Sequence, residues 1–138
     1  MRALDLSRKV PSVKPSDSLA DAARLMLEDH CDCVVIAEED DVVGVVTESD
    51  IVEAVARGAK ADAPIVEAVA SPPLLVEGYE PLWRVAEAML STGIKVAVVT
   101  VGGRFAGVIS SSDIADERGQ LLEASRFAEI AEILAPPG

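Results

Sequence analysis

The chain has 138 residues, of which half are hydrophobic but only 3% are aromatic, and its formal net charge at pH 7 is -12. That charge opposes binding to nucleic acid, since no basic patch offsets it. No stretch approaches the roughly 20 apolar residues that span a bilayer, and the N-terminus lacks the apolar core of a signal peptide. We therefore expect a cytoplasmic protein that binds neither nucleic acid nor membrane, with an aliphatic core.

The first predicted elements are an extended stretch and a helix. Val10–Val13 contains Pro11, which excludes helix and confines the stretch to a sheet edge. Ser18 is a suitable N-cap for the helix, whose apolar positions recur with the helical period. We expect its buried face to comprise Leu19, Ala22, Ala23, Met26 and Leu27. His30 is interpreted as a surface residue at the end of this helix, with contact to a phosphate as the alternative.

Two cysteines, Cys31 and Cys33, lead into the next predicted strand. In an extended segment they are too close for an easy disulfide, and two thiols are too few for a closed metal site. We interpret them as small buried side chains. A redox or metal role is the alternative.

A β-hairpin follows, with β-branched runs over 33–36 and 42–46 joined by an acidic turn. Thr47–Asp50 then provides a good start for a short helix through residue 56. The segment Gly58–Pro64 reads as a helix stop and connector, and Ile65–Val69 as a further turn of helix.

An offset of 63 residues aligns two parts of the chain without a gap, and this alignment shows that the same order of elements recurs. Pro73–Val76 corresponds to the first extended stretch, and Gly102-Gly103 forms the second hairpin turn. Ser110–Asp113 corresponds to Thr47–Asp50 and provides the start of the second short helix. The repeated helical stripe consists of Leu82, Val85, Ala86, Met89 and Leu90.

These elements predict an α/β fold of the α+β type, built from two pseudo-symmetric β-α-β-β-α repeats. One repeat alone would leave its sheet half covered, so we expect the two to pack as a pair. The predicted boundaries are 4–57 for the first repeat, 58–64 for a linker, 65–118 for the second repeat and 119–138 for a C-terminal helical tail. The apolar residues of the tail are expected to cover the chain's own helices, or else to form a homodimer contact or a docking surface for an effector protein.

Each repeat carries the pattern Gly-x-x-[Thr/Ser]-x-x-Asp between a strand and a helix, from Gly44 to Asp50 and from Gly107 to Asp113, after a helix with Ala-x-x-Met. Over residues 4–116 the chain thereby resembles the cystathionine β-synthase (CBS) domain pair, or Bateman module. The resemblance implies two nucleotide sites in the cleft between the repeats. It also implies AMP, ADP, ATP or S-adenosylmethionine as ligand, and a homodimer.

The resemblance also implies which residues bind the ligand. Asp50 and Asp113 would accept hydrogen bonds from ribose hydroxyls, as an ionised carboxylate can from a vicinal diol, while Thr47 and Ser110 would contact ribose or phosphate oxygens. The expected adenine contacts are Val10, Pro11, Ser12, Pro73, Leu74, Leu75 and Val98. The alternative is that the motif side chains only cap helices.

The two copies differ in charge. Lys95 in the second copy corresponds to Asp32 in the first, and Ser111 corresponds to Glu48. We expect a phosphorylated nucleotide to prefer a site with Ser110, Asp113 and Lys95, and Ser111 is a further candidate for ligand binding. For Lys95 the alternatives are service in the other cleft and the role of an ordinary solvated lysine. The family's frequent Pro before the middle strand is replaced by Val34 and Ala97, which leaves the purine contacts less well defined.

We expect no enzyme and no catalytic cofactor, because the only histidine has no recognisable partner and no Gly-rich loop precedes a lysine. The expected function is that of a stand-alone regulatory sensor, with an adenine nucleotide (AMP, ADP or ATP) as its ligand and an unidentified effector protein as a further partner. The alternatives are a structural dimerisation or scaffold module, a regulator that binds S-adenosylmethionine, and a redox-responsive regulator using Cys31 and Cys33.

Overall fold

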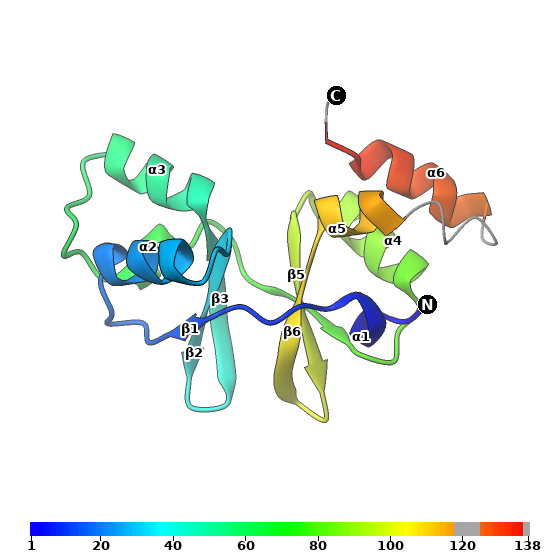
Figure 1. Ribbon diagram of the computed structural model, residues 1–138, viewed down its shortest axis with the longest axis horizontal. Coiled ribbons are helices and arrows are strands. Elements are labelled where there is room, and N and C mark those ends of the chain that lie inside the picture. Colours follow the sequence, from blue (N-terminus) through cyan, green and yellow to red (C-terminus); the bar gives the residue numbers. More distant parts are fainter. Residues whose placement is uncertain (118–124, 137–138) are drawn as a thin grey trace. The chain divides into compact units, whose positions relative to one another are not determined.

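The computed structural model describes residues 1–117 and 125–136 and divides into two compact units (Figure 1). We call Val10–Pro73 the first-repeat unit, and Met1–Lys9 together with Leu74–Gly138 the second-repeat unit. Each unit holds one three-stranded sheet and its helices, which confirms the mixed α/β fold with two repeats. The predicted boundaries 4–57 and 65–118 come from the internal sequence repeat, whereas the two units are defined by which residues pack together.

The first-repeat unit contains β1 (Ser12–Val13), α2 (Leu19–Glu28), β2 (Cys33–Glu38), β3 (Asp41–Thr47), α3 (Glu48–Ala56) and the 3₁₀ turn η1 (Ile65–Ala68). Its sheet has the order β1-β2-β3, with β1 parallel and β3 antiparallel to β2. The stretch that contains Pro11 is therefore at the sheet edge, as predicted. The Pro11 carbonyl accepts a hydrogen bond of 3.0 Å from the Val35 N–H, and an edge position tolerates the N–H that proline lacks.

The second-repeat unit contains α1 (Ala3–Leu6), β4 (Leu74–Glu77), α4 (Leu82–Thr92), β5 (Val96–Val101), β6 (Arg104–Ser110), α5 (Ser111–Glu117) and α6 (Ser125–Leu134). Its sheet repeats the first, with the order β4-β5-β6 and the same parallel and antiparallel pairings. Gly102 and Gly103, with φ of 61° and 80°, form the predicted turn between β5 and β6.

The buried face of α2 is narrower than predicted. Leu19, Ala22 and Met26 are buried, but Leu27 is 77% exposed, and its counterpart Leu90 on α4 is 39% exposed. At about 100° per residue, position 27 lies roughly 80° around the helix from position 19, beyond the arc that meets the sheet. The inclusion of Leu27, and of Leu90 in the repeated stripe, among the buried residues was therefore wrong.

The first nine residues pack on the second repeat rather than on the first. The N–H groups of Ala3 and Leu4 donate to the carbonyls of Glu80 and Gly78, at 2.8 and 3.0 Å, and the Met1 carbonyl accepts from Leu82 at the start of α4. Ala3 is fully buried in the core of this unit. These bonds hold the segment in place against β4 and α4.

The C-terminal helix α6 packs against α4 and α5 of the same unit (Figure 1). Ile130, Ala131 and Leu134 are buried there, which confirms that this part of the tail covers the chain's own helices. Ile133 is 61% exposed. The predicted apolar residues Leu121, Leu122 and Ala124 lie outside the described residues. In the part of the chain described, no helix combines the length and the apolar character needed to cross a bilayer.

Candidate ligand-binding site

The first motif is built on the junction between β3 and α3. Thr47 is the N-cap of α3, and its Oγ1 accepts a hydrogen bond of 3.2 Å from the Asp50 N–H. In return, Asp50 Oδ2 accepts a 2.9 Å bond from the Thr47 N–H. This reciprocal capping box satisfies two backbone donors that the helix leaves unpaired, which explains why these residue types stand three positions apart.

The second motif repeats this geometry between β6 and α5. The Ser110 N–H donates to Asp113 Oδ2 at 2.8 Å, and the Asp113 N–H donates to Ser110 Oγ at 3.2 Å. Ser110 is buried, and its Oγ lies 2.9 Å from that of Ser112. The capping alternative thus describes a real role of both motifs. In each, only Oδ2 serves the cap, and Oδ1 makes no hydrogen bond to the described residues, so a carboxylate oxygen is left to accept a ligand hydroxyl.

Arg8 is the residue that the sequence reasoning missed. Its Nε lies 3.1 Å from Asp113 Oδ2, in an ion pair whose side chains are 33% and 23% exposed. Arg8 also exchanges two backbone hydrogen bonds of 2.9 Å with Val108 on β6. A signal was present, because Arg8 and Lys9 are the only adjacent basic pair in an acidic chain, but its partner is 105 positions away.

The charge difference between the copies is located directly beside the motifs. The Glu48 N–H donates to the Asp32 carbonyl at 3.1 Å, and at the equivalent place the Ser111 N–H donates to the Lys95 carbonyl at 2.9 Å. Each pair therefore lies at the start of the helix that follows the motif. Lys95 is exposed. The first motif is accompanied by two acidic residues, whereas the second is accompanied by a cation and a neutral hydroxyl.

The predicted adenine contacts lie in or just before the first strand of each sheet, except Val98, which lies on the middle strand of the second sheet. In the first-repeat unit, Val10 is buried, while Pro11 and Ser12 lie at the edge formed by β1. In the second-repeat unit, Leu75 is 54% exposed and pairs with the fully buried Val98 on β5. The remaining predicted contacts are Pro73, just before β4, and Leu74, its first residue.

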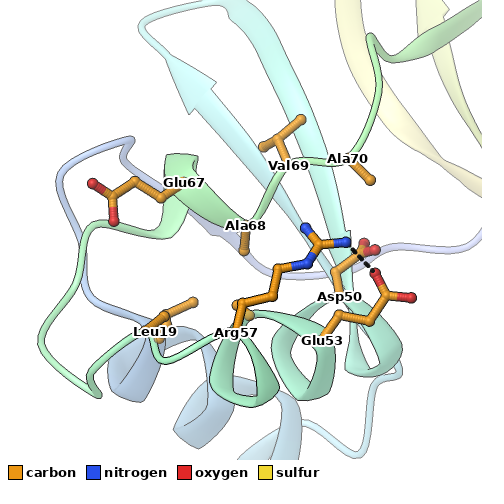
Figure 2. Close-up of a pocket in the computed structure, with 10 residues that line it drawn as sticks. Leu19, Asp50, Glu53, Arg57, Glu67, Ala68, Val69 and Ala70 are labelled. Carbon is orange, nitrogen blue, oxygen red and sulfur yellow. Dashed lines mark ion pairs between the residues drawn. The ribbon is translucent and has the colours of Figure 1, made fainter.

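A pocket of about 200 Å³ lies in the first-repeat unit, beside α3 and the turn η1 (Figure 2). Arg57 and Glu53 form an ion pair of 3.8 Å at this pocket, and Asp50 is the one predicted site residue that lines it. The lining combines apolar and charged side chains; it comprises Leu19, Asp50, Glu53, Ala54, Arg57, Ala59, Glu67, Ala68, Val69 and Ala70.

The two cysteines and the histidine lie outside both motifs in the sequence, although Cys33 on β2 pairs with Thr47 on β3. Cys33 is buried on β2 and Cys31 is half-buried, and no disulfide joins them, in agreement with small packed side chains. His30 is exposed directly after α2, as predicted. Within residues 1–117 and 125–136, no three His, Cys, Asp or Glu side chains are grouped so that they could hold a metal ion.

Comparison with known proteins agrees with this architecture. The profile of the CBS domain matches twice, at residues 2–57 and 62–119. An uncharacterised 17.7 kDa protein of Acidianus ambivalens is 33% identical over 112 residues, which are 78% of this chain and 66% of that protein, slightly under two thirds of its length.

Two solved structures are similar throughout most of the fold. A CBS domain protein from Pyrobaculum aerophilum complexed with AMP has a TM-score of 0.81 and 28% identity, covering 91% of this chain and 98% of the other. A conserved protein from Pyrococcus horikoshii has a TM-score of 0.73 and 30% identity, covering 91% and 92%. With both of its repeats matched, this chain belongs to the CBS domain family and carries a CBS pair.

Proposed function

We propose that this protein is a regulatory CBS pair that binds an adenine nucleotide, with Asp113 as the residue that accepts hydrogen bonds from the ribose. The observation that carries the proposal is the Asp113 carboxylate, which is held through Oδ2 by Ser110 and Arg8 while Oδ1 has no partner among the described residues. A carboxylate fixed in this way can accept hydrogen bonds from a diol without first losing conformational freedom.

Two further observations support an anionic nucleotide as the ligand. Arg8 and Lys95 bring positive charge to the second motif, and the Ser110 hydroxyl accepts a hydrogen bond from the Asp113 N–H. In addition, the Pyrobaculum aerophilum protein of similar structure is complexed with AMP. We infer that AMP, ADP or ATP acts here as a regulatory ligand and not as a substrate, in a cytoplasmic homodimer that acts on an effector protein.

The first motif is proposed to bind such a ligand more weakly. Asp50 takes part in the same kind of capping box as Asp113. However, Asp32 and Glu48 lie beside it, and their negative charges repel a phosphate. S-adenosylmethionine, which carries no phosphate, is the alternative ligand for this motif.

A second candidate function is that of a scaffold or dimerisation module without a ligand. The observation in its favour is that the capping boxes account for Thr47, Asp50, Ser110 and Asp113 through helix stability alone.

Thermal unfolding with AMP, ADP, ATP and S-adenosylmethionine separates the two candidates. A ligand at 100 times its dissociation constant stabilises the folded chain by about 2.7 kcal/mol. We expect AMP to raise the melting temperature of the wild-type chain and of Asp50→Asn, and to have a much smaller effect on Asp113→Asn, whose amide can still accept the capping bond. If none of the four compounds stabilises the wild-type chain, the scaffold reading stands and the nucleotide proposal fails.

A further inference from the structure

We propose that Arg8 is a selectivity residue, which makes the second-repeat site prefer a nucleotide with a phosphate over the uncharged nucleoside. The inference rests on the proposed function, because it assumes that a ligand contacts Asp113. It concerns a residue outside the family motif, supplied by the N-terminal segment that packs on the second repeat.

The backbone fixes the position of Arg8. Its N–H and carbonyl both bond to Val108, each at 2.9 Å, so the residue is aligned with the β6 strand that ends in Ser110. Gly107 permits this approach, because a Cβ at that position would lie 2.8 Å from the Arg8 carbonyl oxygen. Arg8 is therefore placed by the same strand that places Ser110 and Asp113.

The Arg8 side chain gives the two oxygens of the Asp113 carboxylate different roles. Oδ2 accepts from Arg8 Nε at 3.1 Å and from the Ser110 N–H at 2.8 Å. That leaves Oδ1 as the oxygen for a ligand hydroxyl. The guanidinium also offsets the charge of Asp113, and the Arg8 side chain is 33% exposed. A phosphate would otherwise have to approach an uncompensated carboxylate.

The first repeat lacks this device. The position 63 residues after Arg8 holds Ser71, and the residues beside Asp50 are Asp32 and Glu48. A preference for phosphate is therefore expected only at the second motif. There, Arg8, Lys95 and Ser111 are the counterparts of Ser71, Asp32 and Glu48.

The test is isothermal titration of the full chain with AMP and with adenosine. It uses an Asp50→Asn background, so that the titration reports the second-repeat site. Arg8→Gln removes the charge but keeps a polar side chain, and Lys9→Gln, at the neighbouring exposed lysine, is the matched control with the same change in net charge. We expect Arg8→Gln to weaken AMP by about tenfold or more and adenosine by less than about threefold, while Lys9→Gln leaves both within about twofold.

Arg8→Lys adds a test of charge against geometry. It should keep most of the preference for AMP, because the cation is retained although the Nε bond is lost. Circular dichroism and thermal unfolding establish that each variant folds.

Equal AMP affinities in Arg8→Gln and Lys9→Gln would overturn the inference, as would a parallel loss of AMP and adenosine, which is the mark of a structural role only. In both cases the nucleotide proposal would stand, provided that AMP still binds the parent chain. A wild-type chain that binds neither compound would refute the proposed function itself.

Discussion

Arg8 and Asp113 are 105 positions apart in the sequence, yet Arg8 Nε lies 3.1 Å from Asp113 Oδ2. Because both side chains are partly exposed, the ion pair itself contributes less than about 1 kcal/mol to folding. Its importance is positional. It joins the N-terminal segment to the motif at the start of α5, so that the conformation of one affects the other.

The Asp113 carboxylate should matter to stability mainly as a cap. Asp113→Ala removes the acceptor for both the Ser110 N–H and Arg8, and we expect a loss of about 1–2 kcal/mol in the free energy of unfolding. Asp113→Asn keeps an acceptor oxygen and should cost less than about 1 kcal/mol. Asp50 has no arginine partner among the described residues, so the loss in Asp50→Ala should lie between these two values. Urea denaturation measures all three, and equal losses for Asp113→Ala and Asp113→Asn would contradict the capping argument.

The two motif glycines should differ in their tolerance of a methyl group. At Gly107 a Cβ would lie 2.8 Å from the Arg8 carbonyl oxygen, a backbone atom held by two hydrogen bonds, so Gly107→Ala should cost about 1–3 kcal/mol and displace the N-terminal segment. At Gly44 the nearest atom, at 3.0 Å, belongs to the Val69 side chain, which can rotate. Gly44→Ala should therefore cost less.

Hydrogen exchange of the Arg8 and Val108 amides would check this difference directly. We expect both amides to lose protection in Gly107→Ala and to keep it in Gly44→Ala. Retained protection in both variants would show that the segment can adjust without leaving β6.

Local features of the structure could be predicted from the sequence because their signals are local. Ser18 and Thr47 cap the helices that follow them, and Pro11 lies at a sheet edge, since each depends on residues within a few positions. The repeat at an offset of 63 then indicated that both units share one topology. Periodicity alone could not define how wide an arc of α2 meets the sheet, so Leu27 was placed in the core.

The packing of the N-terminal segment could not be predicted in this way. The helix Ala3–Leu6 has only four residues, too few to give a periodic pattern, and its partners Gly78 and Glu80 are more than 70 positions away. The pairing of Arg8 with Asp113 depends on that packing. The motif residues could thus be found in the sequence, whereas the cation beside one of them could not.

Acidification should remove the contribution of the Asp21 carboxylate to folding. The Ser18 backbone N–H, bonded to Asp21 Oδ2 at 3.1 Å, lowers the pKa of Asp21 below its ordinary value of 3.8, and the Ser18 side chain and Arg24 lower it further. A carboxyl group whose pKa is lowered on folding stabilises the protein above its unfolded pKa, and that contribution is lost as the pH falls through the folded value. The difference in unfolding free energy between wild type and Asp21→Asn should therefore be constant near pH 7 and shrink below about pH 4. A difference that does not change with pH would contradict this assignment.

His30 occupies a position where its own repeat partner is glycine. His30 has φ of 52° and Gly93, 63 residues later, has φ of 74°, so both follow their helices in the left-handed region that side chains disfavour. His30→Gly should relieve this strain and stabilise the chain by about 0.5–1 kcal/mol, after the greater freedom of glycine in the unfolded state is counted. Gly93→Ala should destabilise it by about 1 kcal/mol. Because a Cβ there would meet no atom of the described residues within 4 Å, the loss would come from backbone strain. Thermal unfolding of the two variants gives both signs, and a loss of stability in His30→Gly would show that the imidazole contributes a contact worth more than the strain it causes.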